Sequence, residues 1–163
     1  LFELVADCAH VQVAMTQTQR HLDNQVLKGL RVLAVDDHKL NLMILRKVLE
    51  GHGATVLLAE SGAAAIETLS RPDHCDVDVC LMDVQMPDMD GLQTCEYIRH
   101  QLGMKQLPIL ALTAGVMAAD HQLAREAGMN EVLTKPLEID KVLDAVQRWS
   151  TQLTVKARNT SHA

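Results

Sequence analysis

Several polar side chains directly follow short apolar segments of this chain, and their chemical types suit phosphoryl transfer. They are Asp36, Asp37, Asp83, Thr113 and Lys135. If the apolar segments are neighbouring parallel strands, their carboxyl ends meet at one rim of a sheet and bring these groups together. Two carboxylates about 4 Å apart repel each other by about 4 kcal/mol at an effective dielectric of about 20, so the folded chain needs a cation at this rim.

A hard divalent cation and the Lys135 ammonium are the two cations that would suit such a rim. Carboxylate oxygens, a backbone carbonyl and water are the ligands that Mg²⁺ prefers, at about 2.0–2.1 Å. This arrangement would draw a phosphoryl group toward Asp83, whose carboxylate would attack phosphorus, while Thr113 would form a hydrogen bond with a phosphoryl oxygen. The expected product is an acyl phosphate on Asp83.

The elements that position these residues alternate between apolar bursts and segments with helical spacing. The bursts are Arg31–Val35, Ala54–Ala59, Val77–Met82, Pro108–Leu112 and Glu131–Leu133. Continuous apolar strands need a sheet that is covered on both faces, so the alternation predicts an α/β fold with five βα units and a doubly wound parallel sheet. Gly51 and Gly53 are expected to end the helix after the first strand, and Gly128 a helix that begins near Met117.

The two ends of the chain differ from its centre. Residues 1–29 carry apolar residues at 3-4 spacing, which predicts an amphipathic N-terminal helix or linker from a preceding region. That helix is expected to pack on this or a neighbouring domain, and a dimer through it is an open alternative. Residues 30–151 are predicted to form the domain, and residues 152–163 a mobile polar tail. The chain starts at Leu1 and is expected to be a piece of a longer protein.

The amino-acid composition excludes some classes of partner and indicates the kind of core and compartment. Fifteen Lys and Arg against twenty-one Asp and Glu give a net charge of −6, which argues against nucleic acid or an anionic membrane as a partner. Aromatic residues make up only 2%, so an aliphatic core is expected. The four cysteines form no C-x-x-C pair and predict free thiols in a reducing compartment, the cytoplasm. No apolar run approaches a membrane span, so no direct membrane contact is expected, although a longer parent chain could be anchored.

Four motifs, in this order, resemble the receiver domain of two-component response regulators. They are VLAVDDHKLN (Val32–Asn41), LMDVQMPDMDG (Leu81–Gly91), ALTA (Ala111–Ala114) and GMNEVLTKPLE (Gly128–Glu138). Asn41 and the form of the last motif are similar to receivers that are attached to hybrid sensor histidine kinases. The resemblance covers about Leu30 to Thr151. It implies a flavodoxin-like fold with five parallel strands in the order 2-1-3-4-5.

The resemblance also implies a role for each matching residue. Asp83 would be the phosphoacceptor, Asp37 a direct ligand of Mg²⁺ or Mn²⁺, and Asp36 a ligand largely through a bound water. The main-chain carbonyl of Gln85 would be the third protein ligand. Thr113 would be the switch hydroxyl, and Lys135 the phosphate-binding lysine.

Two prolines and one glycine of these motifs also match the family. The Lys135–Pro136 bond is expected to be cis. Pro87 and Gly91 match the turn after the phosphoacceptor, where glycine tolerates a positive φ.

The implied function is a step in a phosphorelay. The domain would accept a phosphoryl group from the phosphohistidine of a histidine kinase or of a histidine phosphotransfer domain, and would catalyse both this transfer and its own dephosphorylation. The protein would then be part of a hybrid histidine kinase.

Two other functions compete with this one. An Asp-nucleophile phosphatase for small substrates would carry a second acid two residues after Asp83, where this chain has Gln85. A nucleotide- or flavin-binding domain would need a Gly-rich or Ser/Thr-rich loop after the first strand, where this chain has Asp36, Asp37 and His38.

One position departs from the family pattern. Three residues before Lys135 the family usually has Tyr or Phe, whose ring turns inward when the threonine moves, and this chain has Val132. We expect Thr113 still to close on the phosphate. The readout is then expected to depend on the loop and helix from Ala114 to Ala127, or on a partner that docks there.

Some neighbouring residues are expected to have smaller roles. His38 could tune the access of donors to the acidic pair. Asp88 and Asp90 are expected to be loop carboxylates that cap the next helix. Met82, Met86 and Met89 are expected to pack under the loop rather than to bind a soft metal.

Overall fold

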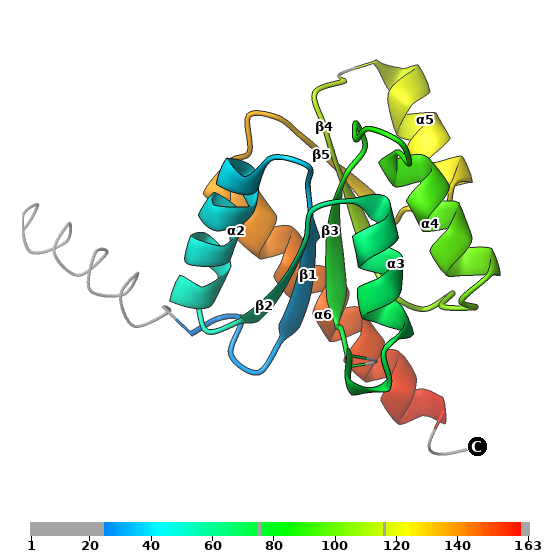
Figure 1. Cartoon of the computed structure of the whole chain (residues 1–163). Coiled ribbons are helices and arrows are strands. Elements are labelled where there is room, and N and C mark those ends of the chain that lie inside the picture. Colours follow the sequence, from blue (N-terminus) through cyan, green and yellow to red (C-terminus); the bar gives the residue numbers. More distant parts are fainter. Residues whose placement is uncertain (1–24, 75, 116, 161–163) are drawn as a thin grey trace, which may run out of the picture.

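A computed structural model of the chain describes residues 25–74, 76–115 and 117–160. The described elements form three layers, a central sheet with helices on both faces (Figure 1). The predicted N-terminal helix lies almost wholly outside the described residues, and residues 25–29 form a turn that leads into the first strand. The proposed dimer through that helix therefore stays a prediction.

The sheet has the predicted topology. Its strands are β1 (Arg31–Val35), β2 (Thr55–Ala59), β3 (Val79–Asp83), β4 (Ile109–Thr113) and β5 (Glu131–Thr134). All neighbours are parallel, and the order β2-β1-β3-β4-β5 confirms the doubly wound, flavodoxin-like prediction. β3 begins two residues later than expected. Just before it, the Asp78 N–H donates to the Arg31 carbonyl, and the Asp78 carboxylate accepts from the Arg31 N–H.

Five α-helices cover the two faces of the sheet. They are α2 (Lys39–Gly51), α3 (Gly62–Ser70), α4 (Gly91–His100), α5 (Ala118–Glu126) and α6 (Ile139–Thr160), and a short 3₁₀ turn, η1, spans Pro72–His74. Helices α2 and α6 pack on one face, and α3, α4 and α5 pack on the other (Figure 1). This placement gives every crossover a helix and leaves both faces of the central strands without water.

Alternate residues of the central strands supply the two halves of the core. Val32 and Leu81 face the α2 and α6 layer, whereas Leu33 and Met82 face the layer of α3, α4 and α5. All four side chains are fully buried. Every buried hydrophobic residue of the described segments is aliphatic, Met or Cys, which confirms the expected aliphatic core.

Glycine ends the helices largely as predicted. Gly53 and Gly128 have positive φ angles of 97° and 101°, the left-handed conformation that stops a helix. Gly51 instead is the last helical residue of α2.

The last helix is longer than the sequence suggested. The polar tail was expected from residue 152, but α6 continues through Thr160. A polar composition alone does not end a helix, and no glycine or proline occurs between Thr151 and Thr160.

The loop after β3 differs in detail from the expectation. Asp90 caps α4 in a reciprocal capping box with Gln93. Asp88 does not cap the helix but takes the positive φ of the loop, 66°. Gly91, expected at a positive φ, has none; it is needed for close packing, since a Cβ there would lie 2.8 Å from the Cα of Val84.

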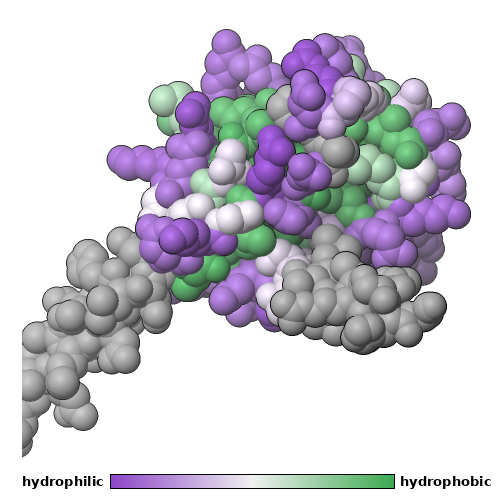
Figure 2. Space-filling view, turned by 90° about the horizontal axis from the view of Figure 1, so that it is seen from below, coloured by the Kyte–Doolittle hydropathy of each residue, from purple (hydrophilic) through white to green (hydrophobic). Residues whose placement is uncertain are grey.

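Figure 2 views the molecule from below, toward the amino ends of the strands, where hydrophobic areas lie among hydrophilic side chains. Among the helices of the described segments, none has the length and the apolar composition that crossing a membrane requires. Cys80 and Cys95 are buried free thiols, as the sequence predicted for these two.

Candidate functional site

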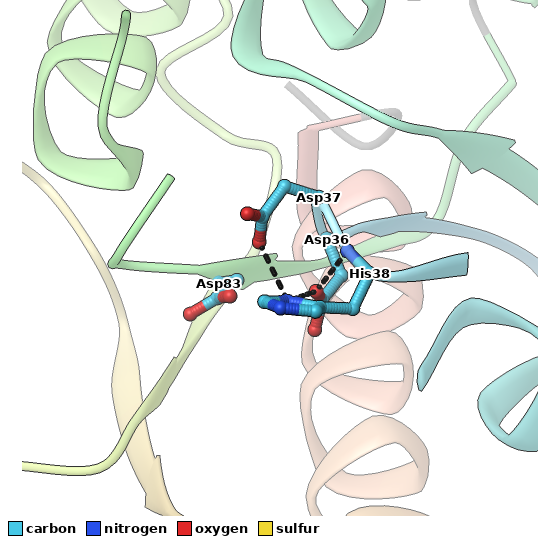
Figure 3. Close-up of side chains that lie close together, drawn as sticks. All are labelled: Asp36, Asp37, His38 and Asp83. Atoms are coloured by element: carbon cyan, nitrogen blue, oxygen red, sulfur yellow. Dashed lines mark hydrogen bonds and ion pairs between the residues drawn. The ribbon is translucent and has the colours of Figure 1, made fainter. Parts of the chain in front are cut away.

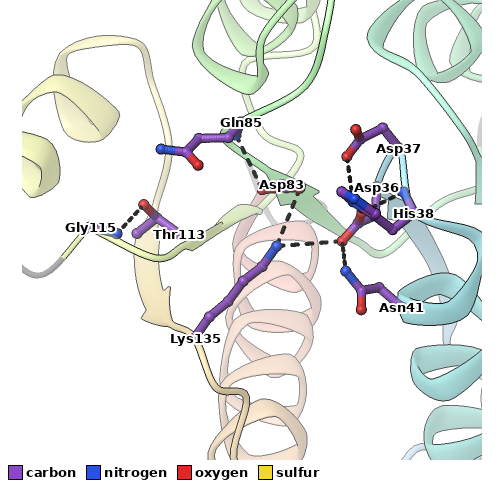
Figure 4. A network of polar contacts seen from close by, with 9 residues as sticks. All are labelled: Asp36, Asp37, His38, Asn41, Asp83, Gln85, Thr113, Gly115 and Lys135. Carbon is purple, nitrogen blue, oxygen red and sulfur yellow. Dashed lines mark hydrogen bonds and ion pairs between the residues drawn. The ribbon is translucent and has the colours of Figure 1, made fainter.

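The sequence-predicted residues meet at the carboxyl end of the sheet. Asp36 directly follows β1, Asp83 is the last residue of β3, Thr113 is the last residue of β4, and Lys135 directly follows β5 (Figure 4). These four elements are consecutive in the sheet order from β1 to β5. The parallel arrangement therefore brings together residues that are up to a hundred positions apart in the chain.

Four side chains form a compact cluster at this rim. Asp36, Asp37, His38 and Asp83 each offer a ligand atom, and these atoms all lie within 4.8 Å of one another (Figure 3). The side chains of Asp36 and Asp83 are only 1% and 4% exposed, and that of Asp37 is 23% exposed. Three carboxylates that lie this close together, two of them almost fully buried, favour the binding of a cation.

Asp36 is held on both carboxylate oxygens. Its Oδ1 accepts a hydrogen bond of 2.8 Å from the His38 backbone N–H, and its Oδ2 accepts one of 3.0 Å from the Asn41 side chain. The Lys135 ammonium lies 3.6 Å from the same Oδ2. Because Asn41 stands in the first turn of α2, the start of that helix fixes the orientation of the buried carboxylate.

Asp83 lies between a backbone donor and an ammonium. Its Oδ1 accepts a hydrogen bond of 3.1 Å from the Gln85 N–H, and its Oδ2 lies 3.2 Å from Lys135 Nζ. Burial raises the pKa of Asp83 above its ordinary value, the Lys135 ammonium opposes this shift, and the charge of Asp36 adds to it. The effect of burial on the pKa of Asp83 therefore outweighs that of the neighbouring ammonium.

Asp37 is the least satisfied of the three acids. Its Oδ1 is buried and accepts no hydrogen bond, although His38 Nδ1 lies 3.0 Å away. A buried carboxylate oxygen without a hydrogen bond is costly, unless a ligand supplies the missing contact.

Thr113 stands at the same rim but bonds within its own loop. Its side chain is buried, and its Oγ1 accepts a hydrogen bond of 2.9 Å from the Gly115 N–H. Its carbonyl accepts from the Lys135 N–H at 2.8 Å, so the backbones of the two residues are tied together. The Lys135–Pro136 bond is cis, as the resemblance implied.

Two contacts of the site were not predicted from the sequence. Asn41 was noted only as a detail of the motif, and the structure shows that it binds Asp36. His38 was expected to affect access, and its ring lies against both acids of the pair. The signal for Asn41 was its position five residues after Asp36, in the first turn of the helix that begins there.

A cavity of about 270 Å³ opens beside the acids, between α2 and the segment after β5. Asp36, Asn41 and Lys135 form its polar side, and Ile44, Leu45, Pro136 and Leu137 its apolar side. Leu40, Met43 and Ile44 on the outer face of α2 are 68%, 65% and 53% exposed. An apolar surface thus adjoins a polar, acidic site.

Residues 32–147 match the family model described as response regulator receiver domain. The chain belongs to this family. The chain is 34% identical over 152 residues to the signal transduction histidine-protein kinase BarA of Escherichia coli K12, a match that covers 89% of this chain but 16% of BarA. The chain therefore spans about a sixth of the length of that relative.

Two solved structures are informative about the site. The receiver domain resembles that of the sensor histidine kinase PA1611 from Pseudomonas aeruginosa, solved with a magnesium ion coordinated in the active site cleft, with 32% identity and a TM-score of 0.68 over 76% of this chain and 98% of that one. It also resembles a chain of the co-crystal structure of the Saccharomyces cerevisiae histidine phosphotransfer protein Ypd1 and the receiver domain of Ssk1, with 26% identity and a TM-score of 0.70 over 78% of this chain and 92% of that one. The protein is thus a receiver domain of a two-component phosphorelay.

Proposed function

We propose that this receiver domain accepts a phosphoryl group from a phosphohistidine onto the carboxylate of Asp83. The observation that supports this choice is the position of Asp83. It is the buried acid at the end of the central strand β3, with Lys135 Nζ 3.2 Å away and the Asp36 and Asp37 carboxylates within the same cluster. The Asp83 carboxylate is largely removed from water, which favours its attack on the phosphorus atom of a phosphoryl group whose oxygens are neutralised by cations.

The proposed step exchanges one bond to phosphorus for another. A carboxylate oxygen of Asp83 forms a bond to phosphorus as the bond from phosphorus to the imidazole nitrogen of the donor breaks. The electron pair of the broken bond stays on that nitrogen, which then takes a proton from solvent. The product is an acyl phosphate, and attack by water on its phosphorus returns Asp83 and releases inorganic phosphate.

The donor set of the cluster fits a hard divalent cation. Asp36, Asp37, Asp83 and the main-chain carbonyl of Gln85 would hold Mg²⁺ or Mn²⁺, with Asp36 acting largely through water. The buried and unbonded Oδ1 of Asp37 supports this assignment, because it is an oxygen that a cation would satisfy. When bound, such an ion supplies positive charge to the phosphoryl oxygens.

Lys135 and Thr113 would respond to the phosphoryl group. Lys135 is 27% exposed and reaches both Asp83 and Asp36, so its ammonium can turn from these acids to a phosphoryl oxygen on Asp83. Thr113 accepts a bond from Gly115, which leaves its hydroxyl hydrogen available to donate to the phosphate. A shift of Thr113 would move the loop that leads into α5.

The partner would be a phosphohistidine domain, either of a histidine kinase or of a histidine phosphotransfer protein. The exposed Leu40, Met43 and Ile44 of α2 form an apolar surface that such a partner could cover, and Ile44 lines the cavity beside Asp36. The Ssk1 receiver, similar in fold, was solved with the phosphotransfer protein Ypd1. We further propose that the domain is part of a hybrid histidine kinase, acts in the cytoplasm, and binds no nucleic acid.

Labelling with a small phosphodonor tests the proposal. The chain is incubated with acetyl phosphate, with and without Mg²⁺, and its intact mass is measured. The wild type should gain one phosphoryl group only with Mg²⁺, Asp83→Asn should gain none, and Asp37→Asn should be labelled more slowly. Asp73→Asn, in the exposed turn η1, serves as the control and should be labelled like the wild type. Labelling that survives Asp83→Asn would refute the choice of acceptor.

A further inference from the structure

His38 is placed over the metal site by its backbone rather than by packing. His38 is the residue directly before α2. Its backbone N–H donates to Asp36 Oδ1, and its side chain makes no capping hydrogen bond. The side chain is 71% exposed, so packing does not hold the ring. The ring nevertheless turns toward the acidic pair, with Nδ1 at 3.0 Å from Asp37 Oδ1 and 3.5 Å from Asp36 Oδ1 (Figure 3).

The short contact between His38 and Asp37 lacks the geometry of a hydrogen bond. Asp37 Oδ1 accepts none, although the ring nitrogen is close enough to donate one. The two atoms are therefore close without forming a hydrogen bond. Ligand atoms of an octahedral ion at about 2.1 Å are about 3.0 Å from their neighbours, which is the separation found here.

We propose that His38 is an additional metal ligand, and that its imidazole nitrogen gives this receiver domain an increased affinity for divalent transition metals such as Co²⁺, Ni²⁺ and Zn²⁺. The inference rests on the proposed metal site of Asp36, Asp37 and Asp83. Imidazole nitrogen binds these ions well and contributes little to Mg²⁺, which prefers oxygen. His38 thus affects which metal is bound more than whether Mg²⁺ is bound.

The competing explanation for the ring position is an ion pair between a cationic His38 and the two acids. The two explanations predict opposite effects of removing the ring nitrogens. A metal ligand, when lost, weakens the binding of Co²⁺. A competing cation, when lost, strengthens the binding of every divalent ion, because the acids become free to bind it.

Titration calorimetry on the whole chain separates these cases. Dissociation constants for Co²⁺ and Mg²⁺ are measured for the wild type and for His38→Phe, which keeps a ring but has no nitrogen ligand. His100→Phe, at the exposed end of α4, is the matched control. The dissociation constant for Co²⁺ should rise at least about tenfold in His38→Phe, and that for Mg²⁺ should change by less than about threefold. His100→Phe should change neither.

Pulsed electron paramagnetic resonance of bound Mn²⁺ gives a direct view of the ligand. The wild type should show a coupling to a histidine nitrogen, and His38→Phe should not. Equal or tighter binding of Co²⁺ by His38→Phe, or the same nitrogen coupling in both proteins, would overturn the role of His38 and leave the magnesium site intact. A wild type that binds neither Co²⁺ nor Mg²⁺ would overturn the metal site itself, and His38 with it.

Discussion

The Lys135 ammonium lies 3.2 Å from Asp83 Oδ2, so the two residues at the ends of β5 and β3 form an ion pair at the rim of the sheet. The same ammonium is 3.6 Å from Asp36 Oδ2. One lysine therefore serves two buried acids, with a third acid, Asp37, beside them. The three acids carry more negative charge than Lys135 neutralises. This excess lets the same side chains attract a divalent ion and then a phosphoryl group whose oxygens contact that ion and Lys135.

Replacing Lys135 by alanine should separate metal binding from the response to phosphate. The dissociation constant for Mg²⁺ should not rise in Lys135→Ala, because a competing cation is removed from Asp36 and Asp83. Phosphoryl transfer to Asp83 should slow by about tenfold to a thousandfold, since the charge stabilisation of the transferring group is lost. Calorimetry and the rate of labelling measure the two effects. Lys141→Ala, which removes an exposed partner of Glu138, should leave both unchanged.

Replacing Asp83 by asparagine should stabilise the fold at neutral pH. The pKa of Asp83 is raised mainly by burial, so its charge destabilises the native state once it ionises. Asparagine keeps an acceptor for the Gln85 N–H and carries no charge. The free energy of unfolding of Asp83→Asn should exceed that of the wild type at pH 7, as measured in urea.

The pH dependence of this gain has a definite sign. A carboxyl group with a raised native pKa favours the folded state at low pH and loses that contribution as pH rises from its unfolded pKa, about 3.9, through its native pKa. The gain of Asp83→Asn should therefore be near zero below that window and fully present above it. A gain that is larger in acid than at pH 7 would contradict the desolvation of Asp83.

Arg99 should matter for stability and not for the site. It is 8% exposed, and its guanidinium donates to the carbonyls of Gly128 and Met104 and to the Asn130 side chain. Arg99→Leu would remove the side-chain donor of the Gly128 and Met104 carbonyls, while Asn130 Oδ1 would keep its bond from the Ile109 N–H. The substitution should cost about 2–4 kcal/mol of unfolding free energy.

Two measurements show whether this interpretation of Arg99 holds. Mg²⁺ affinity should be the same in Arg99→Leu as in the wild type, and the exposed Arg125→Leu should change stability by less than about 0.5 kcal/mol. A loss of metal binding in folded Arg99→Leu would place Arg99 in the function instead.

Val132 should not act as a rotating switch. It is only partly buried, and it lines a cavity of about 370 Å³ between α5, β5 and α6. A valine cannot turn a ring inward when Thr113 moves. Val132→Tyr should therefore alter the affinity for a phosphotransfer partner less than phosphorylation of Asp83 does, as measured by calorimetry. An equal effect would show that the missing ring does control the readout.

Much of the fold and site could be predicted because the sequence patterns that indicate them are local. Each strand is an uninterrupted apolar run, and the polar residue that follows it belongs to the sheet rim whatever the helices do. That logic places Asp36, Asp83, Thr113 and Lys135 together, as the structure has them. The strand bounds differ from the expected ones by up to two residues. At the start of β3, Asp78 bonds to Arg31, a contact between separate segments that a local pattern does not contain.

Other features depend on contacts between distant residues and were missed. Gly91 is needed because its helix passes close to Val84 of the strand end, not because of its φ angle. The ring of His38 lies against Asp37, whose position is set by the end of β1. The continuation of α6 to Thr160 was missed because polar composition was taken as the end of a helix.

Mass spectrometry can identify which residue of the domain carries the phosphoryl group. The chain is treated with acetyl phosphate and Mg²⁺, the acyl phosphate is reduced with borohydride, and the peptides are sequenced by mass spectrometry. Reduction converts a phosphorylated aspartate to homoserine. We expect homoserine at position 83 and aspartate at positions 36, 37, 88 and 90. Homoserine at another position, with Asp83 unchanged, would contradict this expectation.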